Sequence, residues 1–337
     1  SRMKGALLGV HAGDSLGATL EFMIWDDINR KHPTGLRDII GGGSFGWKAG
    51  DATDDTDLTR AVLLAYRDEA RHHQHDKDVT TRAAWYFVDW YDGRNWPGRP
   101  KGLRPQDVGG ATAQGISQFK RCKDWKKSGA GEGRSGNGSL MRCIPIALFR
   151  SDPKKLVEES RTISMITHDD SLCQVSCVAY NVMVRALIDG KGVEEAWQAA
   201  LDVLAELKRE EEGSRIGRKV EEVERALGVA RYRLDLQEFA DQGPRRGGAK
   251  WKEALPFYGD GFVLESLKIA VAAAFDKRSL EEILVDVVRL GRDTDTNGAI
   301  AGGLLGARDG VEAIPERWRE KLQFREEFEA VVDELLA

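Results

Sequence analysis

We predict an all-α fold, a compact bundle of many helices, from three features of the amino-acid sequence. Apolar residues recur at intervals of three and four through most of the chain, the spacing that aligns them on one face of a helix. Runs that alternate apolar and polar residues, as half-buried strands require, are hard to find. The stretch 193–230 is rich in Ala, Leu, Glu, Lys and Arg, all strong helix formers, and holds few helix breakers.

Individual helices and loops follow from the same patterns in chain order. Besides 193–230, apolar residues at helical spacing predict helices at 58–66, 140–146, 172–182 and 283–290. Glycine and polar residues predict irregular segments at 35–52, 93–110 and 120–138, and a basic surface loop at 241–249. No repeat of fixed period and no composition change marks a linker, so we expect a single domain over residues 1–337.

The overall composition excludes several classes of partner. The 50 basic and 55 acidic residues give a formal net charge of -5, and no basic run resembles a nucleic-acid footprint, so nucleic acid is not expected as a partner. No apolar run reaches the roughly 20 residues of a membrane-spanning helix, and the first residues lack the long apolar core of a signal peptide. We therefore expect a monomeric cytoplasmic protein that contacts no membrane.

Cysteines and histidines do not indicate a zinc site or a disulfide framework. No two cysteines form a CxxC pair, and we read all four as reduced, mostly buried thiols: Cys122, Cys143, Cys173 and Cys177. A polar cluster of three histidines lacks the i, i+4 pair of a helical metal site, and we do not read its members as ligands: His72, His73 and His75.

The segment 51–57 gathers four carboxylates and two hydroxyls directly before the predicted helix 58–66. Asp and Thr at a helix start satisfy free backbone amides and interact favourably with the helix dipole, so capping explains one or two of them. Adjacent carboxylates repel one another, however, and hard cations such as Mg²⁺ or Mn²⁺ prefer carboxylate and hydroxyl oxygens. This segment alone leaves capping and metal binding open.

A second acidic segment, 291–298, lies between two apolar stretches near the other end of the chain. Asp293 and Asp295 flank one residue, a spacing that lets both carboxylates approach one ion in a turn, and Thr296 adds a hydroxyl oxygen. The following residues, 299–307, are largely Gly and Ala, which permit close packing of a central helix that would hold this loop rigidly. Two such clusters in one chain favour a metal site more than either cluster alone.

With these clusters and three other motifs, the chain resembles the ADP-ribosylglycohydrolases, the family that includes the dinitrogenase-reductase-activating glycohydrolase and the ADP-ribosyl-arginine and ADP-ribosyl-serine hydrolases. The resemblance covers nearly the whole chain, and its motifs occur in the family's order at compatible spacing. They are GALLG at 5–9 with GDSLGATLEF at 13–22, TDDT at 53–56, GNGSLMR at 136–142, TH at 167–168, and GRDTDT at 291–296.

The resemblance implies an all-α orthogonal bundle with a central cleft that holds two divalent cations, Mg²⁺ or Mn²⁺, beneath an ADP-ribosyl group. By motif position, six residues would supply the metal ligands: Thr53, Asp54, Asp55, Asp293, Asp295 and Thr296. Two cations about 3.5–4 Å apart need several shared oxygens and can hold the vicinal hydroxyls of a ribose. Carboxylates from both ends of the chain would then form one site.

Two further carboxylates match catalytic positions of the family. Glu21 corresponds to an acid that lies beside the metals in several members, whereas we expect Asp14 to cap or orient the first helix. Asp107, in the sequence PQDVG at 105–109, corresponds to an acid beside the scissile ribose in the arginine-directed branch. We therefore name Asp107 and Glu21 as catalytic candidates, for general-base help or for stabilising an oxocarbenium-like transition state.

Six residues are expected to contact the substrate. Gly-rich helix starts bind phosphates readily, which makes the segment 136–139 a candidate for the diphosphate, although a simple helix-opening turn would look the same. The other candidates rest on their position in the family pattern or beside it: His168 near the phosphates or the distal ribose, Phe262 against the nucleotide, and Trp47 at the mouth of the cleft. The full set is Asn137, Gly138, Ser139, His168, Phe262 and Trp47.

These expectations combine into one predicted activity. The protein is predicted to be a metal-dependent ADP-ribosylhydrolase that cleaves the glycosidic bond between ADP-ribose and an acceptor, with protein arginine favoured by the Asp107 motif. The alternatives are a non-catalytic ADP-ribose-binding protein of the crystallin kind, a hydrolase of serine-linked or small-molecule conjugates, and a metal-dependent phosphohydrolase. The expected partners are ADP-ribose or ADP-ribosylated protein.

Overall fold

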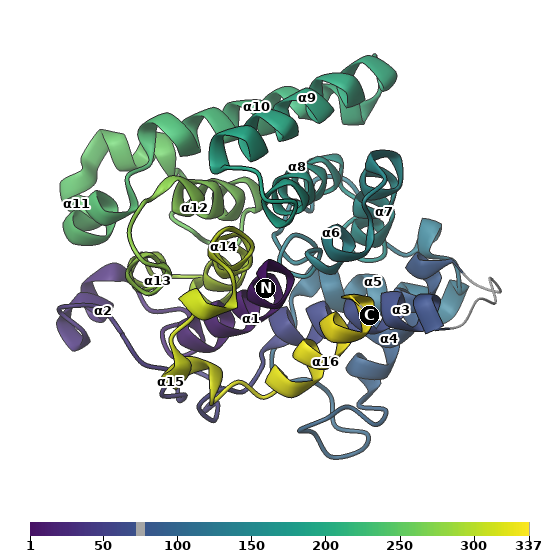
Figure 1. Cartoon of the computed structure of the whole chain (residues 1–337), viewed down its shortest axis with the longest axis horizontal. Coiled ribbons are helices and arrows are strands. Elements are labelled where there is room, and N and C mark those ends of the chain that lie inside the picture. Colours follow the sequence, from purple (N-terminus) through teal and green to yellow (C-terminus); the bar gives the residue numbers. More distant parts are fainter. Residues whose placement is uncertain (72–77, 337) are drawn as a thin grey trace.

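The computed structural model describes residues 1–71 and 78–336, and in this part of the chain every regular element is a helix (Figure 1). His72, His73 and His75 lie outside the described residues. Two isolated β-bridges, Gly42 with Trp47 and Gly136 with Phe262, are the only extended pairings among those described. The helices are α1 Arg2–Gly17, α2 Trp25–Lys31, α3 Asp54–Arg71, α4 Val79–Asp92, α5 Gly110–Cys122, η1 Trp125–Lys127, α6 Pro145–Phe149, α7 Pro153–Met165, α8 Ser171–Ile188, α9 Val193–Glu210, α10 Arg215–Arg233, α11 Leu236–Ala254, α12 Val263–Phe275, α13 Leu280–Arg289, α14 Thr294–Asp309, η2 Val311–Ala313, α15 Glu316–Arg319 and α16 Arg325–Leu336.

Two glycine-rich helices, α1 and α14, form the closest pair in the fold and lie together near its centre (Figure 1). Glycines on one helix face the backbone of the other: a Cβ atom added to Gly9 would lie 2.1 Å from the carbonyl oxygen of Gly302, and one added to Gly13 would lie 1.9 Å from that of Gly298. Since no other residue permits this approach, the glycines bring residues 14 and 295 close together.

Other helices pack around this pair. Helices α8, α12 and α13 contact α14, while α9 and α10 form an outer layer over α8, seen along the top edge of Figure 1. By length and composition alone α8 is able to cross a membrane, but 83% of it is buried inside the molecule, as expected for a core helix. The apolar core runs through nearly all the helices, from Ala6 to Val332.

Two local predictions were wrong. The segment 241–249 was expected to be a surface loop, but it lies in α11, which is broken at Gly243 and Gly248, where φ is +67° and +52°. The segment after Ser139 was expected to be a helix from residue 140, but it forms turns, and α6 begins only at Pro145. In the first segment the glycines break a helix without ending it, and in the second a series of turns precedes the helix. The cysteines are free, as predicted, and only Cys122 is exposed.

Candidate active site

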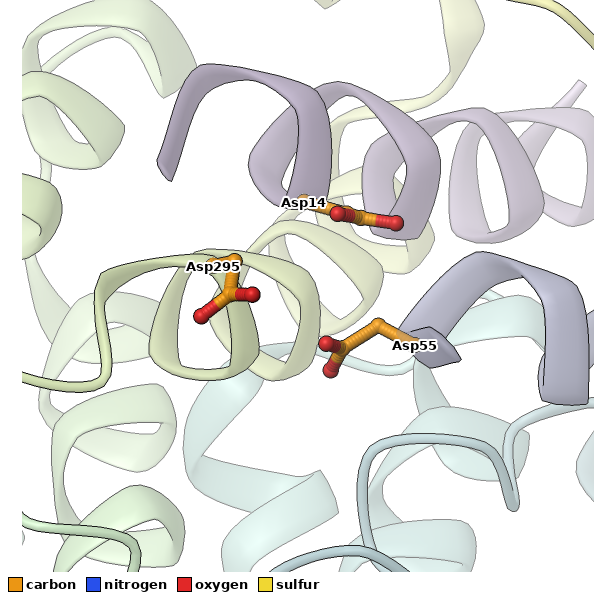
Figure 2. Close-up of side chains that lie close together, drawn as sticks. All are labelled: Asp14, Asp55 and Asp295. Atoms are coloured by element: carbon orange, nitrogen blue, oxygen red, sulfur yellow. The ribbon is translucent and has the colours of Figure 1, made fainter. Parts of the chain in front are cut away.

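Three buried carboxylates from three helices converge at the centre of the fold. Asp14 lies on α1, Asp55 on the first turn of α3, and Asp295 on the first turn of α14. Each supplies a carboxylate oxygen, and these oxygens all lie within 4.8 Å of one another. Figure 2 shows the three side chains close together, one on each of the three helices. Segments from both ends of the chain therefore form one acidic cluster.

Asp14 has a different structural role from the one expected. Its Oδ2 accepts hydrogen bonds of 3.1 Å from the backbone N–H groups of both Thr53 and Thr56, and another from the Thr56 hydroxyl. It therefore caps the start of α3 rather than α1, which contains it. Because a capping carboxylate orients the first turn of a helix, Asp14 also positions Asp55.

The hydroxyls of Thr53 and Thr296 both lie at Asp55. Each donates to Asp55 Oδ2, at 3.1 Å from Thr53 and 3.3 Å from Thr296. A hydroxyl from α14 thus reaches a carboxylate of α3, although the two residues are 241 positions apart in sequence. Four of the six predicted ligands line the cleft described below: Asp54, Asp293, Asp295 and Thr296.

A second group of carboxylates lies beside the first. Oxygens of Glu21, Asp107 and Asp295 are also within 4.8 Å of one another. Burial raises the pKa of Glu21 to about 9, with further repulsion from Asp107. Burial and the charge of Asp293 raise the pKa of Asp107 to about 6. Asp295 belongs to both groups, so the two catalytic candidates adjoin the predicted metal ligands.

The donor set fits hard divalent cations. Four buried carboxylate oxygens accept no hydrogen bond from the part of the chain that the structure describes: Asp14 Oδ1, Asp55 Oδ1, Asp295 Oδ1 and Glu21 Oε2. Burial, and then repulsion between the carboxylates, raises the pKa of Asp55 and Asp295 well above the usual range. Buried oxygens with neither partner nor countercharge are costly, and Mg²⁺ or Mn²⁺ coordinated by them would remove that cost.

Several carboxylates line a cleft with a volume of about 430 Å³, among them Glu21, Asp54, Asp107, Asp293 and Asp295. The start of α5, the segment 136–138 and His168 line the same cleft. The side-chain nitrogen of Asn137 donates to Asp293 Oδ2 at 2.7 Å and to Ser266 Oγ at 2.9 Å, so it joins the segment 136–138 to an acidic residue of the cleft. The cleft thus combines acidic side chains with a polar, glycine-rich segment.

Three of the six predicted substrate residues line this cleft: Asn137, Gly138 and His168. Burial lowers the pKa of His168 to about 3, so its ring is neutral, and its Nδ1 lies 2.8 Å from the Thr167 hydroxyl. Gly138 is needed because a Cβ there would lie 2.8 Å from the His168 ring. The backbone N–H of Asn137 donates to Gly261 at 3.0 Å, so this amide already has a partner.

The other three predicted substrate residues lie elsewhere. Ser139 is buried, with its hydroxyl 2.8 Å from that of Ser164, and the Phe262 ring packs edge-on against Phe257, with ring centroids 4.9 Å apart. Neither residue lines the cleft. Trp47 lines a second pocket that adjoins the cleft at Asp54 and Asp107.

Several residues that line the cleft were not predicted from the sequence. Phe22 is 60% exposed at the cleft and, like Arg292, has a positive φ, at 67° and 69°. The two strained residues are joined by a 2.8 Å hydrogen bond from the Phe22 N–H to the Arg292 carbonyl. Asp260 and Thr112 also line the cleft. Phe22 and Arg292 lie inside recognised motifs, and only their neighbours were assigned roles there.

The all-α fold and the acidic cleft define the class of protein. The whole chain, residues 1–337, matches the family model described as ADP-ribosylglycohydrolase. The chain therefore belongs to the ADP-ribosylglycohydrolase family, and the predictions of that family, of its all-α fold and of a glycosidase-type hydrolase are confirmed.

The matches to three named relatives each cover nearly all of this chain. The chain is 29% identical to the ADP-ribosyl-[dinitrogen reductase] glycohydrolase of Rhodospirillum rubrum, over 100% of this chain and 96% of that protein. It is 27% identical to the ADP-ribosylarginine hydrolase Tri1 of Pseudomonas putida, over 99% and 77%, and 25% identical to human ADP-ribosylhydrolase ARH3, over 99% and 93%. A solved structure described as an ADP-ribosylglycohydrolase-related protein complex shares the fold, with a TM-score of 0.69, 24% identity, and coverage of 98% and 95%.

Proposed function

We propose that this protein is a divalent-cation-dependent ADP-ribosylhydrolase that releases ADP-ribose from arginine side chains of proteins. The observation that carries the proposal is the group of buried carboxylates, from α1, α3 and α14, beside a cleft large enough for a nucleotide-sized ligand. The arginine linkage is supported by two relatives, one named as an ADP-ribosylarginine hydrolase and the other as acting on dinitrogen reductase.

The cation site would be built from the residues described above. Asp55 and Asp295 would hold the cations together with Asp54, Asp293 and the two threonine hydroxyls, while Asp14 orients α3. When bound, Mg²⁺ or Mn²⁺ would neutralise the carboxylates and polarise the ribose hydroxyls. Neutral His168 lines the same cleft and would offer a hydrogen bond to the rest of the ADP-ribosyl group, while Asn137 holds Asp293.

Asp107 is the stronger candidate for the general base. It is more exposed than Glu21, which is 6% exposed, and it lines both the cleft and the adjoining pocket. A carboxylate at that junction can remove a proton from an attacking water or stabilise positive charge on the ribose as the acceptor leaves. Glu21, buried against Asp295, is better placed to support the cation site.

Product analysis tests the proposal. The protein is incubated with arginine-ADP-ribosylated and serine-ADP-ribosylated proteins, with Mg²⁺ and with a chelator, and free ADP-ribose and phosphate are measured. We expect Mg²⁺-dependent release of ADP-ribose from the arginine-linked substrate. Release of phosphate would favour a phosphohydrolase, release from serine alone would overturn the linkage, and binding without release would favour a non-catalytic ADP-ribose-binding protein.

A further inference from the structure

A second pocket, of about 380 Å³, adjoins the cleft. Its lining includes Trp47, Arg99, Gln106 and Gln323, and it shares only Asp54 and Asp107 with the cleft. We call it the acceptor pocket. If the ADP-ribosyl group occupies the cleft, as the proposed function requires, the bond to be broken lies near Asp107, and the leaving acceptor extends into this second space.

The acceptor pocket offers hydrogen-bond donors without partners. Arg99 uses one nitrogen, Nη2, to donate to the Trp90 carbonyl at 2.6 Å. Its Nε and Nη1 are buried, as is the indole Nε1 of Trp47, and none of these three atoms has a hydrogen-bond partner in residues 1–71 or 78–336. Burial of unsatisfied donors is costly, so their presence at a pocket indicates a ligand that accepts hydrogen bonds there.

One acidic residue of this pocket has no oxygen left for a ligand. Both carboxylate oxygens of Asp57 accept hydrogen bonds of 2.8 Å from indole nitrogens, one from Trp90 and one from Trp96. Asp51 accepts a hydrogen bond of 2.9 Å from the backbone N–H of Lys48. Asp57 is therefore not available to a ligand, whereas Arg99 and Trp47 retain unused donors, one of them on a guanidinium.

We propose that the acceptor pocket binds the backbone carboxyl or carbonyl group of the ADP-ribosylated arginine through Arg99 and Trp47. This inference rests on the proposed function and goes beyond it, because it states which part of the acceptor is recognised. The acidic pair at the junction faces the guanidino end, and the donors of Arg99 and Trp47 receive the oxygens at the other end. A charged hydrogen bond of this kind changes affinity by about tenfold to a hundredfold.

The test compares two substrates that differ only in that carboxyl group: ADP-ribosyl-arginine and ADP-ribosyl-agmatine, which lacks it. In the wild-type protein we expect a KM at least about tenfold lower for the arginine conjugate. Arg99→Met should remove this preference by raising the KM for ADP-ribosyl-arginine, while kcat and the KM for the agmatine conjugate change by less than about twofold. Trp47→Phe, which keeps an aromatic side chain but lacks the indole N–H donor, should reduce the preference in the same direction.

Arg104→Met is the matched control, because Arg104 belongs to the same loop and stacks on Tyr91 but does not line the acceptor pocket. It should leave the preference unchanged. Equal losses on both substrates in the Arg99 and Trp47 variants would assign both residues a structural role and overturn the inference, as would a wild-type protein that cleaves both conjugates equally well. A wild-type protein that cleaves neither conjugate would overturn arginine hydrolysis itself, and the acceptor pocket with it.

Discussion

The side-chain amide of Asn137 donates a hydrogen bond of 2.7 Å to Oδ2 of Asp293 and so joins two distant segments that line the cleft. This bond favours the ionised form of Asp293, against the effect of burial, which raises its pKa. Partners of this kind orient the carboxylates that surround a cation, and their loss lowers metal affinity or activity by about tenfold to a hundredfold.

Asn137→Ala should therefore reduce ADP-ribose release by about tenfold to a hundredfold and raise the Mg²⁺ concentration needed for half-maximal rate. Ser266→Ala, which removes the other partner of Asn137 but leaves the bond to Asp293, should have a smaller effect. Steady-state rates measured across a Mg²⁺ series check both expectations. Full activity of Asn137→Ala at low Mg²⁺ would show that Asp293 does not need this partner.

The glycine contact between α1 and α14 predicts a large loss of stability on a small substitution. Gly9→Ala places a methyl group 2.1 Å from the Gly302 carbonyl oxygen, so the helices must separate, at a cost of about 3 kcal/mol or more in the free energy of unfolding. Gly228→Ala is the matched control, since a Cβ there meets no atom within 4 Å, and it should stabilise α10 by about 0.5–1 kcal/mol. Urea denaturation measures both, and equal stability of the two variants would contradict the packing described.

The hydrogen bonds that Asp57 accepts should stabilise the loop 93–109, which carries Asp107. Its two oxygens hold Trp90, at the end of α4, and Trp96, in the following loop. In Asp57→Asn the amide can accept from only one indole, so we expect faster hydrogen exchange in residues 93–109 and a fall in kcat of about tenfold, by the loss of one charged hydrogen bond. Unchanged exchange in this loop would mean that Asp57 does not hold it.

The lowered pKa of buried His11 should contribute to the pH dependence of the free energy of unfolding. Burial lowers the pKa of His11 to about 4; its Nε2 accepts from the Phe324 N–H at 3.4 Å, and its Nδ1 lies 3.1 Å from the Ser15 hydroxyl. The unfolded chain therefore binds a proton at His11 below pH 6.5, whereas the folded state binds it only near pH 4. The free energy of unfolding should fall by up to about 3 kcal/mol on this account as the pH drops through that window.

His11→Gln removes this contribution, so the fall in its free energy of unfolding from pH 6.5 to 4 should be smaller than that of the wild-type protein by up to about 3 kcal/mol. Chemical denaturation at a series of pH values measures the difference in slope. Parallel curves for the two proteins would show that His11 takes up its proton equally in the folded and unfolded states.

The helices and the acidic clusters could be predicted from sequence because they depend on local patterns. Apolar spacing identified α8 and α13, and the small residues of 299–307 indicated a closely packed helix, which is α14. The partner of that helix was not apparent, although Gly5, Gly9 and Gly13 recur every four residues in α1. Periodic glycine shows that a close approach is possible, but not which helix makes it.

The remaining features of the site depend on contacts between distant segments. Asp14 was expected to cap or orient its own helix, whereas it caps α3, about 40 residues away. The positive φ of Phe22 and Arg292 could not be read from residue type, since neither Phe nor Arg favours that conformation. The acceptor pocket likewise depends on Trp47 and Arg99, which lie in different loops.

The central claim is that the carboxylates of α1, α3 and α14 form a site for divalent cations. Calorimetric titration of Mn²⁺ into the metal-free wild-type protein, Asp55→Asn, Asp295→Asn and the surface variant Asp202→Asn tests it most directly. We predict saturable binding of two cations by the wild-type protein and Asp202→Asn, and loss of at least one of them in each of the other two variants. Undiminished binding of two cations by Asp55→Asn and Asp295→Asn, or no binding by the wild-type protein, would contradict the claim.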